Sequence, residues 1–112
     1  MDAAAELADR VRALLMSEPG LEEKRMFGTR AFLLGGRILV GARKEGVLLV
    51  RVTAERGAVL LAEPGVAVAV MGAKSMGPSW LDIAPAALEQ DEQLMYWVDA
   101  ARESAADPHL PS

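Results

Sequence analysis

The chain has 112 residues, of which 52% are hydrophobic and 25% are charged. This length and this balance fit one compact globular domain, and they exclude a multidomain enzyme and a disordered chain. The absence of cysteine and the single histidine exclude disulfides, a thiolate nucleophile and a zinc–thiolate cluster. Because the formal net charge is −4, the molecule as a whole does not attract polyanions, and any basic site must be local.

The first residues lack the basic and apolar parts of a signal peptide. Apolar runs such as Val66 to Met71 are far shorter than the ~20 residues that cross a bilayer. We therefore expect a cytoplasmic protein with no membrane partner. The sequence predicts one domain over residues 1–106, and a flexible tail over residues 107–112, which contain two prolines.

The first predicted element is an amphipathic helix. Its apolar stripe begins at Leu7 and continues four, seven and eight residues later with Val11, Leu14 and Leu15. Asp2 is suited to cap its start, and Pro19-Gly20 must follow its end. This stripe has to pack against a further layer.

Between Lys24 and Val52 the pattern changes to apolar runs rich in β-forming residues. Gly35-Gly36 and Lys44-Glu45-Gly46 are typical hairpin turns between these runs. We predict three antiparallel strands, of which the first is a single bent strand over Lys24 to Leu34. Gly28 lies inside it, where a glycine commonly marks a bulge or a close backbone approach.

The second half contains further elements of both kinds. Thr53 is suited to cap a short helix over Ala54 to Ala62, which Gly57 weakens. Val66 to Met71 and Ser79 to Ile83 are typical of two more strands, joined by a glycine-rich stretch.

Pro85 opens a last turn and helix, whose apolar face consists of Leu94, Trp97, Val98 and Ala101. The predicted order is helix, three strands, helix, two strands, helix. Amphipathic helices beside a mainly antiparallel five-stranded sheet define a two-layer α+β fold, because neither layer can otherwise bury its apolar face.

The sequence contains no recognisable catalytic or metal-binding pattern. His109, the natural candidate for acid–base chemistry, lies between two prolines in the predicted tail and is expected to be solvated. Gly72 to Pro78 contains Lys74 and offers only a weak phosphate-nest signal. We expect no catalytic residues, no cofactor and no bound metal, and therefore no enzyme.

Charge is distributed unevenly along the chain. The segment 24–51 holds seven basic residues and one acidic residue, a net charge of +6, so the rest of the chain carries −10. This separation suits an acidic partner, a nucleic acid or a second copy of the chain, although a solvated sheet face would look the same. The candidate contact residues are Lys24, Arg25, Arg30, Arg37, Arg43, Lys44 and Arg51.

Several short motifs occur together in this chain: Lys24-Arg25-Met26-Phe27-Gly28, Ala31-Phe32 and, near the end, Leu94-x-x-Trp97-Val98. As a set they resemble the N-terminal domain of the TfoX (Sxy) competence-regulator family, over nearly the whole chain. Thr29 stands where the family usually has a second glycine, and Met76 to Trp80 departs from a Met-Lys-Gly-Trp-like segment. The motif residues, which we expect to be structural, are Met26, Phe27, Gly28, Ala31, Phe32, Trp80 and Trp97.

The resemblance implies an α+β fold with the predicted order of elements and no established catalytic residues. It also implies a free-standing regulatory or protein-interaction module related to transcriptional control. We expect an unidentified protein partner or a homodimer. The alternative is a nucleic-acid-binding protein that uses the basic segment 24–51, although no helix-turn-helix pattern supports it.

Overall fold

The computed structural model describes residues 2–26 and 28–106. Phe27, the predicted tail 107–112 and its His109 lie outside the described residues. The helices are α1 (Ala3–Leu15), α2 (Ala54–Leu60) and α3 (Asp91–Ala105). Two short 3-10 turns span Lys44–Gly46 and Pro85–Ala87.

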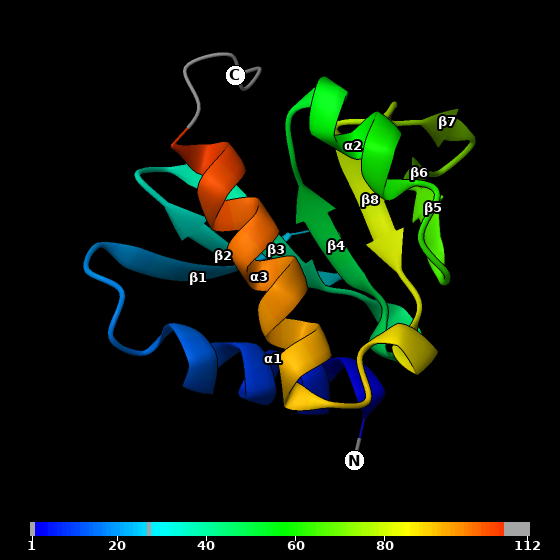
Figure 1. The fold of residues 1–112 in the computed structure, drawn as a ribbon. Coiled ribbons are helices and arrows are strands. Elements are labelled where there is room, and N and C mark those ends of the chain that lie inside the picture. Colours follow the sequence, from blue (N-terminus) through cyan, green and yellow to red (C-terminus); the bar gives the residue numbers. More distant parts are fainter. Residues whose placement is uncertain (1, 27, 107–112) are drawn as a thin grey trace.

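The strands are β1 (Leu21–Met26), β2 (Thr29–Leu34), β3 (Arg37–Ala42), β4 (Leu48–Arg51), β5 (Val66–Val68), β6 (Val70–Met71), β7 (Lys74–Ser75) and β8 (Trp80–Ile83). Six of them form one sheet in the order β1-β2-β3-β4-β8-β5, with every neighbouring pair antiparallel. β6 and β7 form a separate two-stranded ribbon. Helices α1 and α3 lie on one side of the sheet, and α2 lies over the ends of β4 and β8 (Figure 1). The predicted two-layer α+β class is confirmed.

The prediction of one bent strand over Lys24 to Leu34 is wrong. The chain instead reverses direction between Met26 and Thr29, which are register partners in the antiparallel pairing of β1 with β2. Gly28 has a φ of +77°, a conformation that suits glycine in a tight turn. β1 had no apolar alternation to reveal it, because its residues 22–25 are all charged and exposed. The sheet therefore has six strands rather than five.

The prediction of a continuous strand over Val66 to Met71 is also wrong in part. β5 ends at Val68, and the chain leaves the sheet at the buried Ala69. The backbone of Ala69 bonds to Trp80 on one side and to Met76 on the other, at 2.8 Å each. These two bonds close the β6–β7 ribbon at its base.

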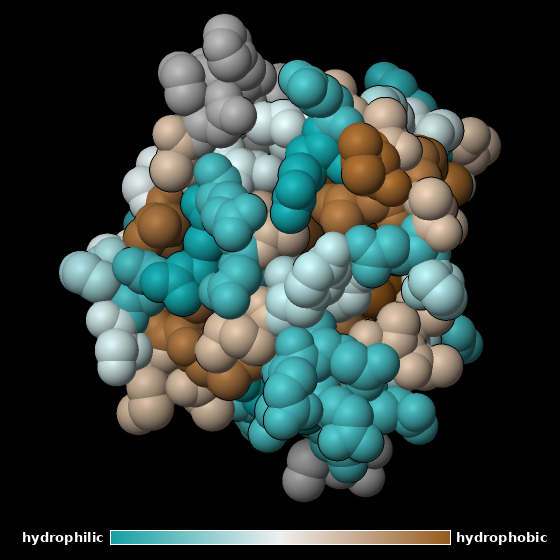
Figure 2. All heavy atoms as spheres, in the orientation of Figure 1, coloured by the Kyte–Doolittle hydropathy of each residue, from teal (hydrophilic) through white to brown (hydrophobic). Residues whose placement is uncertain are grey.

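The core lies between the sheet and the helices. One row of register partners crosses four strands and belongs to the buried cluster: Phe32, Val40, Val50 and Leu81. The predicted helix stripes pack on this row, including Leu7 and Val11 of α1 and Leu94 and Trp97 of α3. Figure 2 shows the helix-covered side, where hydrophilic side chains are interspersed with hydrophobic ones at the right, where α2 and β5 lie, and also at the left.

The helix starts follow local side-chain chemistry. The predicted caps are confirmed: Asp2 accepts a hydrogen bond from the Ala4 amide at 3.0 Å, and Thr53 accepts one from the Arg56 amide at 3.2 Å. α3 begins at Asp91 rather than at Pro85, because Pro85 opens a 3-10 turn and Gln90 forms the helix cap.

Candidate functional site

The sheet has a second face that none of the described helices covers. Side chains alternate between the two faces of a strand, so the residues next to the core row project away from the helices. Arg51 and Trp80 are register partners on β4 and β8, and both project to this helix-free face. It is here that the polar and apolar side chains of five strands meet.

A hollow of about 670 Å³ opens on the helix-free face, and we call it the Arg51 hollow. Its volume lies within the range of small-ligand sites. No residue of α1, α2 or α3 lines it, and its lining contains no acidic side chain. The lining residues are Lys24, Met26, Leu33, Gly36, Arg37, Ile38, Arg51 and Trp80.

Arg51 is the least usual residue of this hollow. Arg51 is only 7% exposed, and its Nε is buried with no hydrogen-bond partner. None of the described carboxylates forms an ion pair with it; its guanidinium instead lies 5.1 Å from the centre of the Trp80 ring. Burial lowers the pKa of Arg51, and the positive charge of Arg37 lowers it further. A cation is thus held in a site that penalises its charge.

The structure divides the seven predicted basic residues among four places. Lys24, Arg37 and Arg51 share the Arg51 hollow. Arg43 binds Asp82 at 2.8 and 3.0 Å and donates to the Val70 carbonyl at 3.1 Å, which neutralises its charge.

The other three basic residues lie elsewhere. Lys44 is exposed in the turn between β3 and β4. Arg25 and Arg30 are register partners that project toward the helix side of β1 and β2, where Arg30 lies 4.0 Å from Glu23. The predicted basic segment is therefore not one continuous surface.

The motif residues separate into two groups. Ala31, Phe32 and Trp97 are buried, and Gly28 lies in the β1–β2 turn. Met26 and Trp80 are half-buried and line the Arg51 hollow. The sequence did not single out the apolar lining residues Leu33 and Ile38; the available signal was a basic residue, Arg51, at the end of an otherwise apolar strand.

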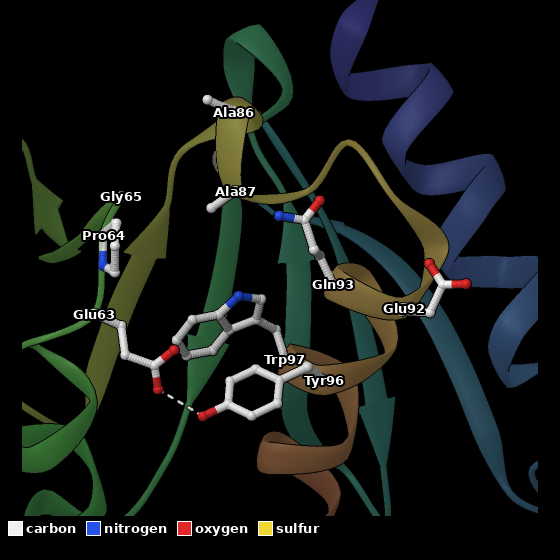
Figure 3. A pocket seen from close by; sticks show the side chains of 9 residues that line it. All are labelled: Glu63, Pro64, Gly65, Ala86, Ala87, Glu92, Gln93, Tyr96 and Trp97. Carbon is white, nitrogen blue, oxygen red and sulfur yellow. Dashed lines mark hydrogen bonds between the residues drawn. The ribbon is translucent and has the colours of Figure 1, made fainter.

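A second pocket, of about 550 Å³, lies on the helix side between α3 and the segment that joins α2 to β5 (Figure 3). Tyr96 donates a hydrogen bond to Glu63 Oε2 at 2.6 Å, which raises the pKa of Tyr96. The ring of Trp97 lies edge-on to Tyr96, with centroids 5.0 Å apart. No basic side chain lines this pocket, and the contact of Tyr96 with Glu63 ties α3 to the segment that joins α2 to β5.

Within 2–26 and 28–106 no group of three or more histidine, aspartate or glutamate side chains is placed to hold a metal ion. No helix in these ranges is long and apolar enough to span a membrane. The segment 72–78 forms part of the β6–β7 ribbon, where Lys74 pairs with Met71 and is exposed.

These features define a two-layer α+β domain whose open sheet face carries a positively charged hollow. A family comparison matches residues 13–105 to the TfoX N-terminal domain, and the chain belongs to that family. The predicted resemblance is confirmed. No protein with a curated description matches the chain.

A solved structure of a protein from Pseudomonas syringae is similar to this chain in fold. The superposition has a TM-score of 0.63 and covers 86% of this chain and 97% of the other, at 8% sequence identity. At this identity the likeness concerns the fold alone.

Proposed function

We propose that this domain is a non-enzymatic regulatory module that binds a partner protein through the helix-free face of its sheet. The observation that carries the proposal is the composition of that face around the Arg51 hollow. Methionine, tryptophan and arginine are enriched in protein interfaces, and Met26, Trp80 and Arg51 meet there. Membership of the TfoX N-terminal domain family supports a regulatory role.

The charge of the hollow indicates what the partner presents. Lys24, Arg37 and Arg51 line it without an acidic residue among them. An acidic surface on the partner is the complementary charge, and it steers the encounter as well as fixing the orientation. A second copy of this chain qualifies, because the residues outside 24–51 carry a net charge of −10.

Binding to nucleic acid is the second candidate and has less support. A nucleic-acid surface needs a continuous row of cations that follows the phosphates. Here Arg43 is neutralised by Asp82, and Arg25 and Arg30 project to the other side of the sheet. On the helix-free face, Lys24, Arg37 and Arg51 line one hollow rather than a continuous row.

A matched pair of variants tests the proposal. Lys24 and Arg25 are adjacent, exposed residues of β1 that project to opposite faces. We expect Lys24→Glu to weaken binding of an acidic partner about tenfold or more, since it places a like charge in the interface, and Arg25→Glu to leave it nearly unchanged. The measurement is affinity capture from the native cell extract with quantification of each retained protein, followed by a binding constant for the purified partner.

Each outcome of this experiment has a definite meaning. A partner lost with Lys24→Glu and retained with Arg25→Glu supports the proposed face, and light scattering shows whether that partner is a second copy. A partner that both variants retain equally contradicts the proposal that the helix-free face binds it. A strict monomer that captures no protein and binds DNA with steep salt dependence favours the second candidate.

A further inference from the structure

The Arg51 guanidinium has an unusual environment for a charged group. Arginine is rarely buried without a carboxylate, because removal of its charge from water is costly unless the charge is paired. Arg51 is 7% exposed, its Nε lacks a hydrogen-bond partner, and stacking on Trp80 supplies no acceptor for its N–H groups. The free domain therefore holds a buried donor that an added acceptor would satisfy.

The surroundings of Arg51 add positive charge rather than compensate it. Arg37 and Lys24 line the same hollow, and the charge of Arg37 acts unfavourably on Arg51. The rest of the lining includes Leu33, Ile38 and the Trp80 ring, which lower the local dielectric and strengthen every electrostatic interaction there. Repulsion between like charges in such a place is relieved by a negative group.

We propose that the Arg51 hollow is a binding site for an oxyanion, a phosphate or carboxylate group that Arg51 holds and that Lys24 and Arg37 help to neutralise. A guanidinium presents a planar fork of N–H donors, which matches both groups in geometry. The adjoining apolar wall accommodates the organic part of a ligand or the stem of an acidic side chain. This inference rests on the proposed function and extends it, because an oxyanion site defines the chemistry by which the partner would be recognised.

The test needs only the purified domain and therefore stands apart from the search for a partner. The domain is titrated with inorganic phosphate and with succinate, while sodium chloride keeps the ionic strength constant. The Nε–H signal of Arg51 in an NMR spectrum reports directly on the site. We expect it to shift saturably in the millimolar range, and at ten times the Kd the Tm should rise by about 5 °C.

Variants separate this site from general salt effects. Arg51→Met keeps an unbranched apolar stem and removes the charged guanidinium, so it should abolish the anion-dependent rise in Tm. Arg51→Lys, which loses the planar fork, should weaken binding about tenfold. Arg25→Gln, on the other side of the sheet, should respond as the wild type does. Should Arg51→Met fail to fold, the titration of the wild-type signal still decides the question.

Four results are informative. Saturation by free phosphate or succinate indicates a small anionic ligand, whereas saturation by a glutamate-rich peptide alone indicates an acidic segment of a protein; both support the oxyanion site. An Arg51 signal that none of these probes moves overturns the proposal, as does an equal rise in Tm for wild type and Arg51→Met. If the oxyanion site is refuted, the Lys24 and Arg25 variants still decide whether the surrounding face binds a protein.

Discussion

At the scale of single residues, Gly57 shows how a contact can reverse an ordinary helix rule. Glycine in a helix interior is destabilising relative to alanine, and the sequence interpretation treated Gly57 as a weak point of α2. In the structure a Cβ at this position would lie 1.7 Å from the Pro78 carbonyl oxygen and 2.8 Å from its carbon. Only the absence of a side chain lets α2 approach the segment that precedes β8.

We predict that Gly57→Ala lowers the free energy of unfolding by about 1–3 kcal/mol, the usual range for overpacking. Helix propensity alone predicts the opposite sign, a gain of up to about 1 kcal/mol. Urea denaturation measures the difference. Ala58→Gly, at the exposed neighbouring position, is the control and should follow propensity with a loss of about 1 kcal/mol. A Gly57→Ala protein more stable than the wild type would contradict the close approach.

At the scale of elements, α1 is joined to the edge strand β1 by a two-point ion pair. Arg12 Nε lies 2.9 Å from Glu23 Oε1, and Arg12 Nη2 lies 2.8 Å from Glu23 Oε2. The hydrogen bonds from Arg12 lower the pKa of Glu23, and burial opposes that shift only in part. Because Glu23 is on the helix side of β1, the pair holds an otherwise charged and exposed strand against the helix layer.

This pair makes stability depend on pH in a defined direction. A carboxylate whose pKa is lower in the folded state stabilises the fold above its unfolded pKa of about 4.3, and this contribution is lost as the pH falls through the folded value. We predict that Glu23→Gln costs about 0.5–1 kcal/mol at pH 7, since both partners are partly solvated. The cost should diminish as the pH falls through the lowered folded pKa of Glu23, as followed by urea denaturation at several pH values. Glu22→Gln, on the other face of β1, is the control, and an equal pH profile for both variants would contradict this assignment.

The β6–β7 ribbon is attached to the sheet by Arg43. This residue follows β3 and joins two elements, since it pairs with Asp82 on β8 and donates to the Val70 carbonyl of β6 at 3.1 Å. Apart from the bonds at Ala69, this is the polar link between the ribbon and the sheet among the hydrogen bonds of the described residues.

We predict that Arg43→Met loosens the ribbon locally. Amide hydrogen exchange in residues 70–75 should speed up about tenfold or more, while exchange in β3 and β4 changes little, because the ribbon contributes few buried groups to the core. Lys44→Met, which removes the neighbouring exposed charge, should leave exchange in the ribbon unchanged. Equal acceleration throughout the sheet would show that Arg43 supports the whole fold instead.

At the scale of the whole molecule, the sequence was most informative where burial is one-sided. α1 and α3 each bury one stripe, so the period of Leu7 and Val11, or of Leu94 and Val98, predicted both helices and their inner faces. β1 was missed because residues 22–25 carry charge on both faces, which leaves no period to detect. β1 is defined by its pairing with β2, and a local sequence pattern does not contain this information.

The sequence identified the basic residues of the candidate site, but it did not show which of them lie together. Arg51 was among the seven basic residues, yet all four residues of β4 are buried, so alternation could not assign its side chain to a face. Nor could the sequence place Trp80 beside it, since β8 reaches β4 only after the chain has passed through α2 and β5. The meeting of these two residues is a product of topology.

The order of strands gives the ribbon a particular place in the architecture. β5 and β8 are already paired with each other, and β6 and β7 grow outward from between them as a branch. The backbone hydrogen bonds of Ala69 close this branch at its base, so β6 and β7 pair only with each other and not with a strand of the main sheet. The turn at residues 72 and 73, between β6 and β7, can therefore change in length at little cost to the main sheet, which makes it the natural position for a grafted peptide or reporter.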